Sequence, residues 1–591
     1  MKQENSIQKN SITYIKIENF KGISDPVRID LKPITLLFGG NSAGKSTILQ
    51  SLQYVREILE RNNTNPDKTM NGGDSVDLGG FRNLVNMRDP NKRIAIEVEL
   101  ALKGRGLPDL VPESFNDSAI DNSEVWEFYV SLQETINRVE TVSVKLVVAW
   151  SVLRNTAVVV GYHVGANGVW LAEINATEDG RDVSFKLNKH NPIFILQLDD
   201  DSESILELNQ LLDIEDWISA SDIGDEKTVE LEDDMFISSS YSILPGILYS
   251  VREAGMEKPG DGLRAWLVGF NGALPKLDSL LDIPSPGAIG ADNLFIAREF
   301  TSFISSLIIG PGMLLRDELS KLRYVGPIRL MPRRDFDVSL TKDDARWADG
   351  LAGWEALLSG ENSFVEEVSD WMADSEKLAT GYQVERHIVS ELPYDYLQLL
   401  DKKDHEPEVL ISIITQAMAE NLKAKILLVD SKNGISLQPR DVGIGISQVL
   451  PVVAAALEPS ASIVTIEQPE LHIHPAIQVG LGDLFIHSAF KHGMTFLIET
   501  HSEHLMLRLL RRIREAAEED FPAHMPKITP EDINVIYVER TKNGMVLSPI
   551  EIDANGKFLG RWPQGFFSER MLESLSKDVR EKVEAKRRET Q

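Results

Sequence analysis

Eight residues near the start of the chain have the types and the spacing of a phosphate-binding loop. The stretch fits the pattern Gly-x-x-x-x-Gly-Lys-Ser/Thr in full. Backbone N–H groups in such a loop curl around phosphates, and a helix that begins there adds the positive end of its dipole. Lys45 is expected to reach the β- and γ-phosphates of ATP, and Ser46 to ligate Mg²⁺. The residues expected to bind ATP are Gly39, Gly40, Asn41, Ser42, Ala43, Gly44, Lys45, Ser46 and Thr47.

A carboxylate is also expected to bind the Mg²⁺ ion, and one stands directly after an apolar run. Residues 463–466 are apolar or β-branched, and Glu467 and Gln468 follow them. We assign Glu467 to Mg²⁺, together with Ser46. Gln468 stands where a glutamate that activates water is usual, and a neutral amide orients water without accepting its proton. Glu470 is the candidate substitute base. The alternative is that Glu467 and Glu470 only lie on a turn and have no role in catalysis.

A glycine-containing segment, 441–448, precedes Glu467 and opens an apolar helical pattern over 449–457. Small residues at a helix N-terminus make an anion site. In dimers that sandwich ATP, such a segment from one subunit contacts the γ-phosphate bound by the other. A glycine-rich turn that caps a buried helix is the alternative, and the position just before Glu467 favours the nucleotide. The residues assigned to the nucleotide are Gly443, Gly445, Ser447 and Gln448.

Several histidines and arginines follow. His501 comes after the apolar run 496–498, and we expect it to hydrogen-bond the γ-phosphate and report the nucleotide state. His472 and His474 lie on an expected turn, where they do not converge well, and this disfavours a metal site. The basic face of the next helix either pairs with the abundant acids or docks nucleic acid or an acidic partner; it consists of Arg508, Arg511, Arg512 and Arg514.

These residues need a sheet to position them. The run 34–38 is continuously apolar, as in a strand buried on both faces, and a helical pattern follows the loop. Alternation with a period of two recurs over 94–187, with turn residues between the runs, and predicts an antiparallel β-subdomain. The predicted fold class is α/β: a P-loop NTPase with a mixed sheet and flanking helices.

We expect four parts. Residues 1–190 form an N-terminal ATPase lobe with the phosphate loop and the antiparallel β-subdomain, and 191–320 a mainly helical, acidic insertion without the heptads of a coiled coil. Residues 321–524 form a C-terminal ATPase lobe with the glycine segment, Glu467 and His501. Residues 525–591 form a small α+β unit that contains the block Trp-Pro-Gln-Gly-Phe-Phe at 562–567.

Composition narrows the function classes. The 591 residues include no cysteine, which excludes disulfides, cysteine-ligated metals and a thiol nucleophile. No apolar run of membrane-spanning length and no secretory signal is seen, so a cytoplasmic protein without a membrane partner is expected. The net charge of −30 opposes general adhesion to nucleic acid, although a local basic groove keeps DNA open.

Five segments together resemble a known group: Asn-Phe-Lys-Gly at 19–22, the phosphate loop, 441–451, 466–475 and 499–504. They look like the ABC-type ATPase heads of RecF, SMC proteins and the overcoming-lysogenization-defect nucleases. The nearest pattern is a prokaryotic subgroup with Ile-Glu-Gln-Pro-Glu-Leu-His-Leu-His-Pro and a C-terminal Trp-Pro-x-Gly-Phe-Phe domain of unknown function. The segment 324–329 also resembles that subgroup.

The resemblance implies a head-to-tail homodimer with two ATP molecules between the phosphate loops and the glycine segments; a higher oligomer stays open. Two departures bear on turnover: Gly443 stands where a serine is usual, and Gln468 replaces the glutamate base. Both favour a slow ATPase. Residues after Glu539 leave no room for the metal-dependent nuclease domain of the overcoming-lysogenization-defect proteins, so no nuclease is expected in this chain.

Three functions remain open at this point. The first is a regulatory or scaffolding ATPase of a prokaryotic antiphage defence system, with a nuclease or toxin effector on a separate chain. The second is a RecF-like DNA repair ATPase that acts on DNA directly. The third is a nucleotide-gated interaction protein that hydrolyses little ATP.

Overall fold

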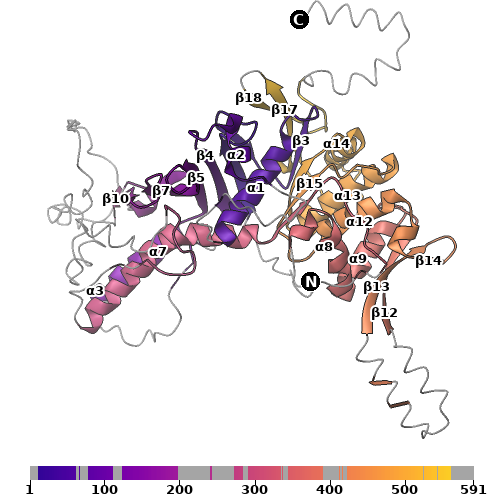
Figure 1. Cartoon of the computed structure of the whole chain (residues 1–591), viewed down its shortest axis with the longest axis horizontal. Helices are drawn as coiled ribbons and strands as arrows, with labels where there is room; N and C mark the ends of the chain where they lie inside the picture. The colour runs from indigo at the N-terminus through magenta and orange to yellow at the C-terminus, as the bar shows by residue number, and fades with distance from the viewer. Residues whose placement is uncertain are drawn as a thin grey trace, which may run out of the picture. The chain divides into compact units, whose positions relative to one another are not determined.

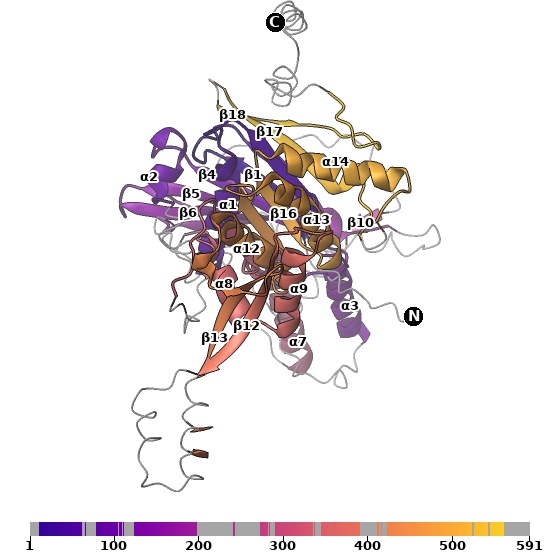
Figure 2. The same ribbon diagram turned by 90° about the vertical axis from the view of Figure 1, so that its right-hand side faces the viewer.

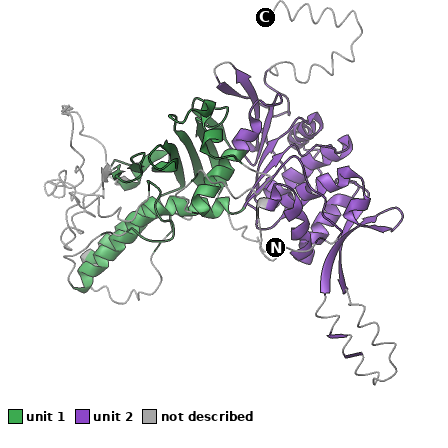
Figure 3. Ribbon diagram, viewed as in Figure 1, with its two compact units in different colours: residues 1–30, 50–71, 77–321 green, residues 31–49, 72–76, 322–591 purple. Residues whose placement is uncertain are grey.

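The computed structural model describes residues 11–61, 78–104, 123–188, 190–197, 240–242, 272–281, 290–334, 344–390, 422–522, 525–541 and 544–560, and isolated positions between these ranges. The chain divides into two compact units (Figure 3). Unit 1 comprises 1–30, 50–71 and 77–321, and unit 2 comprises 31–49, 72–76 and 322–591. Each unit has its own main sheet.

The main sheet of unit 2 has six strands in the order β11-β15-β16-β3-β17-β18. All neighbours are parallel except β17 and β18. The central strands β3, β15 and β16 are buried along their whole length, as the continuous apolar runs predict. The bounds are Leu322–Val325 (β11), Ile463–Glu467 (β15), Thr495–Glu499 (β16), Ile34–Gly39 (β3), Ile533–Thr541 (β17) and Gly544–Pro549 (β18).

Helices of unit 2 cover this sheet. α12 packs on β15, and α13 packs on β16 and β3 (Figure 1). α12 is apolar nearly all round, and its residues from Ile446 to Leu457 are buried, so it lies inside the core and not on the surface. The helices are α8 (Leu351–Ser359), α9 (Asn362–Ala373), α12 (Ile444–Leu457), α13 (Pro475–Lys491) and α14 (Glu503–Ala517).

A second, three-stranded sheet in unit 2 joins β12 (Tyr382–Ser390), β13 (Leu422–Asp430) and β14 (Ser436–Leu437). Both pairs are antiparallel, and the β12–β13 ribbon projects from the helices of this unit (Figure 2). α9 packs on β12 and α8 on β13. The ribbon leads into residues 391–421, most of which lie outside the described ranges.

The main sheet of unit 1 has seven strands in the order β2-β1-β4-β5-β6-β7-β8, and every neighbouring pair is antiparallel. Alternating burial along β4 and β5 matches the period of two in their sequences. The bounds are Ser11–Glu18 (β1), Val27–Asp30 (β2), Ile94–Ala101 (β4), Thr141–Ser151 (β5), Thr156–Ala166 (β6), Val169–Ala176 (β7) and Val183–Leu187 (β8).

Two long helices accompany this sheet in unit 1, α3 (Ser123–Asn137) and α7 (Ala291–Leu319). The sequence shows no apolar run of membrane-spanning length, yet α7 is long and apolar enough to cross a membrane by length and composition alone. The most apolar window of α7 is 78% buried inside the protein, where α7 packs on α3 and β5. A buried core helix passes the same test, so its composition is weak evidence for a membrane span.

The structure has the predicted α/β class: a mixed sheet with flanking helices, and an antiparallel β-subdomain over the predicted residues. The strand expected in a separate unit at 525–591 behaves differently. β17 pairs in parallel with β3 along 533–538, so this strand completes the sheet that carries the phosphate loop. Most of the acidic insertion, and the Trp-Pro-Gln-Gly-Phe-Phe block at 562–567, lie outside the described residues.

Candidate nucleotide site

The predicted phosphate loop joins the end of β3 to the start of α1 (Lys45–Glu60). Gly39 needs to be glycine, because its φ is +146° and a Cβ there would lie 2.1 Å from the carbonyl oxygen of Val538. Ser42 and Gly44 also have positive φ, which turns the backbone between strand and helix. Gly40, Asn41 and Ser42 are exposed, and a Cβ on Gly40 would meet no atom within 4 Å. The loop therefore presents an open backbone surface at a helix N-terminus.

Lys45 and Ser46 lie on the inner side of this loop. The Lys45 side chain is only 2% exposed, and its ammonium donates to the carbonyl oxygens of Gly39 (3.2 Å) and Gly40 (3.0 Å). It also lies 3.5 Å from a carboxylate oxygen of Glu499. The other oxygen of Glu499 accepts a 2.6 Å hydrogen bond from the Ser46 hydroxyl. One carboxylate thus contacts both functional side chains of the loop.

Glu499 is the residue that the sequence analysis did not assign a role. It ends β16, which pairs directly with β3, and Glu499 lies opposite Leu37 in the register. Carboxyl ends of neighbouring parallel strands meet at one edge of a sheet, which is where open α/β sheets bind ligands. The acid at the end of the run 495–499 is the signal that was available in the sequence.

Glu467, which the sequence assigned to Mg²⁺, ends β15, one strand further from β3. It lies opposite Glu499 in the register, and it is 7% exposed. Its carboxylate accepts a hydrogen bond from the Tyr324 hydroxyl of β11. The two carboxylates therefore end neighbouring strands, and Glu499 is the one in contact with Ser46.

Gln468 begins a tight turn directly after β15. Its φ is +45°, and its backbone N–H donates to the Glu499 carbonyl at 2.8 Å. This bond fixes the direction of the turn that leads to Glu470. Gln468 is therefore held by its backbone at the same sheet edge as the two carboxylates.

Glu470 ties this turn to the segment after β16. One carboxylate oxygen accepts from the Thr500 hydroxyl at 2.8 Å, and the other accepts from the His501 backbone N–H at 2.6 Å. Burial raises the pKa of Glu470, against the lowering effect of these hydrogen bonds. Both oxygens are engaged, so the contacts of Glu470 are those of a positioning residue.

His501 follows β16 at this edge. Burial, and secondarily the positive charge of Lys45, lower the pKa of His501 below its ordinary value of 6.5. The imidazole is therefore neutral at pH 7. A neutral imidazole offers one donor and one acceptor nitrogen, so it can hydrogen-bond a phosphate oxygen as the sequence analysis expects.

The glycine segment 441–448 lies at the start of α12. Gly443 precedes the helix, and Gly443 and Ile444 are exposed. Ser447 and Gln448 point inward instead: the Ser447 hydroxyl donates to the Ile444 carbonyl at 2.8 Å, and both side chains are buried. The exposed start of the segment, and not Ser447 or Gln448, is thus the part open to a second molecule. Gly445 has a separate constraint, since a Cβ there would lie 2.9 Å from the His472 carbonyl oxygen.

Arg329 connects the glycine segment to the end of β15. It is 2% exposed, and its guanidinium donates to the carbonyls of Glu467 (2.8 Å) and Gln468 (3.3 Å). The Gln448 side-chain amide donates to the Arg329 carbonyl at 2.6 Å. Burial lowers the pKa of Arg329 to about 10, so the side chain stays charged at neutral pH. In the sequence, 324–329 stands out only as part of the family resemblance.

The remaining predicted residues have local roles in the described part of the chain. The His474 side chain caps α13 by accepting from the Ala476 N–H. Arg512 and Arg508 pair with Asp483, and Arg511 pairs with Glu515. These ion pairs match the simpler interpretation of the basic face, in which the arginines neutralise neighbouring acids.

The chemistry of the loop fits a nucleoside triphosphate with Mg²⁺. An ammonium, an exposed glycine-rich backbone and a helix N-terminus are suited to phosphate oxygens. A hydroxyl and carboxylates at the same edge are the hard oxygen ligands that Mg²⁺ prefers. The donor set at Lys45, Ser46, Glu467 and Glu499 is therefore consistent with both groups.

Three parts of the chain match family models. Residues 11–210 match "AAA ATPase domain", and 333–507 match "AAA domain, putative AbiEii toxin, Type IV TA system". Residues 528–574 match "Protein of unknown function (DUF3696)". No curated protein matches the chain in sequence.

Solved structures of SMC head domains resemble the chain remotely. A crystal structure of the SmcHead bound to the C-winged helix domain of ScpA is 12% identical, covers 92% of this chain and 98% of its own, and has a TM-score of 0.36. An SMC head domain from Thermotoga maritima is 9% identical, with 92% and 99% covered and a TM-score of 0.32. Likeness at this level supports no argument about function. The two ATPase matches include the phosphate loop in the first case and the Glu467–His501 region in the second.

Proposed function

We propose that the chain binds ATP with Mg²⁺ at 39–47 and hydrolyses it slowly, so that nucleotide occupancy is what the protein reports. The observation that carries the proposal is the sheet edge at which Lys45 and Ser46 contact Glu499, beside Glu467 and Gln468. A buried lysine next to an exposed glycine loop is suited to a phosphate chain. The family matches to AAA ATPase domains agree with this chemistry.

In the proposed site, Lys45 and the backbone of the loop hold the β- and γ-phosphates. Ser46 would hold Mg²⁺, with Glu467 or Glu499 as the acidic partner. When bound, Mg²⁺ would neutralise charge on the phosphates. Binding would also require Lys45 and Ser46 to exchange their present contacts with Glu499 for contacts with the nucleotide and the metal.

Slow turnover follows from the residues near the expected water. Gln468 cannot accept a proton from water, because its amide is neutral. Glu470 is the other candidate base, but each of its oxygens already accepts a hydrogen bond, one from Thr500 and one from His501. We therefore assign Glu470 to positioning and His501 to sensing the γ-phosphate.

We further propose a homodimer in which the exposed start of α12 completes the site of the partner. Gly443 and Ile444 would contact the nucleotide held by the other copy, while Gln448 and Arg329 link that start to Glu467 and Gln468 inside each chain. This link gives nucleotide contacts at α12 a direct route to the end of β15. ATP-dependent dimerisation, measured by light scattering, is expected to fail in Gly443→Trp and to persist in the surface control Lys16→Ala.

For the biological role, we propose a regulatory subunit of a prokaryotic defence system in the cytoplasm, with a separate nuclease or toxin effector. The description of the second matching family, a putative AbiEii toxin of a type IV toxin–antitoxin system, agrees with this class. We keep the four-part division proposed from the sequence as part of this proposal. In the last part, 525–591, strand β17 pairs with β3, the strand that leads into the phosphate loop.

Three experiments separate the alternatives. Duplex DNA binding by the isolated protein that weakens steeply with salt would support the RecF-like repair function and contradict the defence role. ATP binding without measurable turnover, even at high protein concentration, would support the interaction protein. Co-purification of a toxin or nuclease encoded beside this chain, released or retained according to the nucleotide, is the result expected for the defence role.

A further inference from the structure

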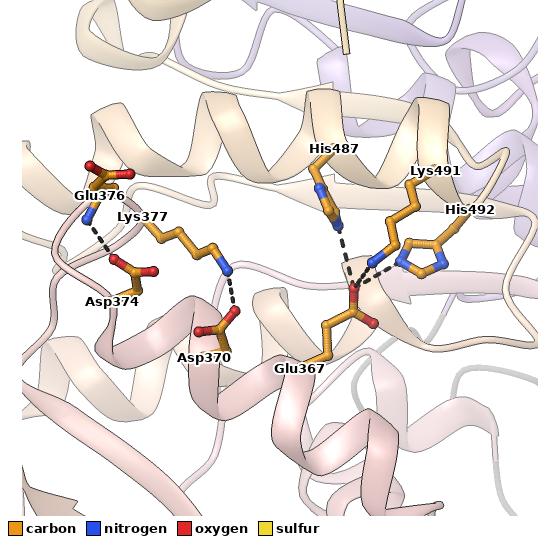
Figure 4. A network of polar contacts seen from close by, with 8 residues as sticks. All are labelled: Glu367, Asp370, Asp374, Glu376, Lys377, His487, Lys491 and His492. Carbon is orange, nitrogen blue, oxygen red and sulfur yellow. Dashed lines mark hydrogen bonds and ion pairs between the residues drawn. The ribbon is translucent and has the colours of Figure 1, made fainter. Parts of the chain in front are cut away.

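Outside the nucleotide site, two histidines and a glutamate of unit 2 converge between α9 and α13 (Figure 4). Glu367 lies on α9, His487 on α13, and His492 directly follows α13. The ring nitrogens Nε2 of both histidines lie 3.3 Å from the same oxygen of Glu367, and the three ligand atoms all lie within 4.8 Å of one another.

These separations match a tetrahedral metal site. Zinc binds imidazole nitrogen and carboxylate oxygen at about 2.0–2.2 Å, and at a tetrahedral angle such ligands lie about 3.3 Å apart. Two of the three edges of the ligand triangle already have this length. The third edge, between the histidines, lies within the 4.8 Å limit.

The surroundings hold the two imidazoles in place and favour a cation. The His487 ring packs edge-on against Trp371, with 5.1 Å between ring centroids, and Trp371 is buried. The backbone N–H of His492 donates to the Ser488 carbonyl, which places His492 at the C-terminal end of α13. The negative end of a helix dipole favours positive charge at that point.

Lys491 is the group that competes with a metal ion. Its ammonium lies 3.0 Å from the Glu367 oxygen that both histidines face, and the side chain is 56% exposed. An exposed lysine swings into solvent at small cost, which leaves the three ligands free to close on an ion.

We propose that Glu367, His487 and His492 bind Zn²⁺, with water in the fourth position, and so join α9 to α13. Three protein ligands and one open position are a common zinc arrangement. Of the three ligands, His487 lines a pocket of about 410 Å³, together with Lys377 and Asp483. The site does not depend on nucleotide, so its test is independent of the ATPase proposal.

The test is titration of the full chain with Zn²⁺ by calorimetry, without nucleotide, and with Co²⁺ followed by its visible absorption. One ion per chain and the absorption of tetrahedral Co²⁺ are expected. His487→Ala and His492→Ala should each weaken binding by more than about 100-fold, since losing even an outer-shell partner costs 10–100-fold. Glu367→Gln should weaken binding in the same way, and circular dichroism checks that each variant is folded.

Lys491→Met tests the proposal without removing any of the three ligands. Removing a positive charge from beside a dication should strengthen Zn²⁺ binding by about five- to tenfold. The double variant His472→Ala/His474→Ala should leave binding unchanged, because these histidines lie outside the cluster. Absence of Zn²⁺ binding, or binding that is unchanged in His487→Ala and Lys491→Met, would contradict the proposal. The cluster would then only join α9 to α13 by ion pairs.

Discussion

The ends of β15 and β16 carry equivalent residues in different surroundings. Glu467 and Glu499 stand opposite each other in a parallel pair, and both are buried. Glu467 contacts Tyr324 of β11, whereas Glu499 contacts Lys45 and Ser46 of the phosphate loop. The difference follows from strand order, because β16 lies between β15 and β3. The motif therefore points to Glu467 as the Mg²⁺ ligand, whereas the position in the sheet points to Glu499.

The largest effect expected is on hydrolysis in Glu467→Gln. If Glu467 holds Mg²⁺, turnover should fall by about 10²–10³-fold, the range for losing one preorganised electrostatic group. ATP binding in the absence of Mg²⁺ should persist. Steady-state phosphate release and equilibrium binding measure the two quantities. Undiminished Mg²⁺-dependent turnover would transfer the metal role to Glu499.

Gln468→Glu should act in the opposite direction. A general base contributes about 10²–10⁴-fold, and a new carboxylate that is not fully positioned should recover at least about tenfold in turnover. Single-turnover hydrolysis measures the change. Glu470→Gln is the matched control: a fall in turnover as large as that gain would make Glu470 the base and contradict its assignment to positioning.

Glu499→Gln tests the difference between Glu467 and Glu499 through ATP affinity. The Glu499 carboxylate contacts Lys45 and Ser46, and ATP must displace these contacts. Neutralising the carboxylate should therefore raise ATP affinity without Mg²⁺ by about tenfold. This factor corresponds to the lower end of the free energies of hydrogen bonds to charged groups. Glu467→Gln should show no such gain. Equal effects of the two variants in a fluorescence titration would remove the distinction between the two strand ends.

The smallest effect is expected for Tyr324→Phe. Loss of the hydroxyl leaves the buried Glu467 carboxylate with one donor fewer, which should lower the free energy of unfolding by about 1–3 kcal/mol. ATP affinity should stay within about twofold, since the hydroxyl that is removed donates to Glu467 at the end of β15. Urea unfolding measures the first quantity. A large loss of ATP affinity with normal stability would show that Glu467 acts in nucleotide binding itself.

Local patterns predicted the α/β class, the antiparallel sheet and the loop, because burial on one or two faces sets the period of a strand. They could not give strand order. Glu499 was left unassigned for this reason, and β17 was assigned to a separate unit although it lies beside β3. Sequence alone also gives no direction to a side chain, so the inward position of Ser447 and Gln448 and the burial of Arg329 come from the structure.

The central claim is that 39–47 bind ATP, and Lys45→Ala tests it most directly. The Lys45 ammonium is buried beside the loop carbonyls and Glu499, and no other residue of the loop carries a positive charge. Equilibrium binding of a fluorescent ATP analogue should be lost in Lys45→Ala, with Lys16→Ala as the surface control. Unchanged binding in folded Lys45→Ala protein would contradict the account.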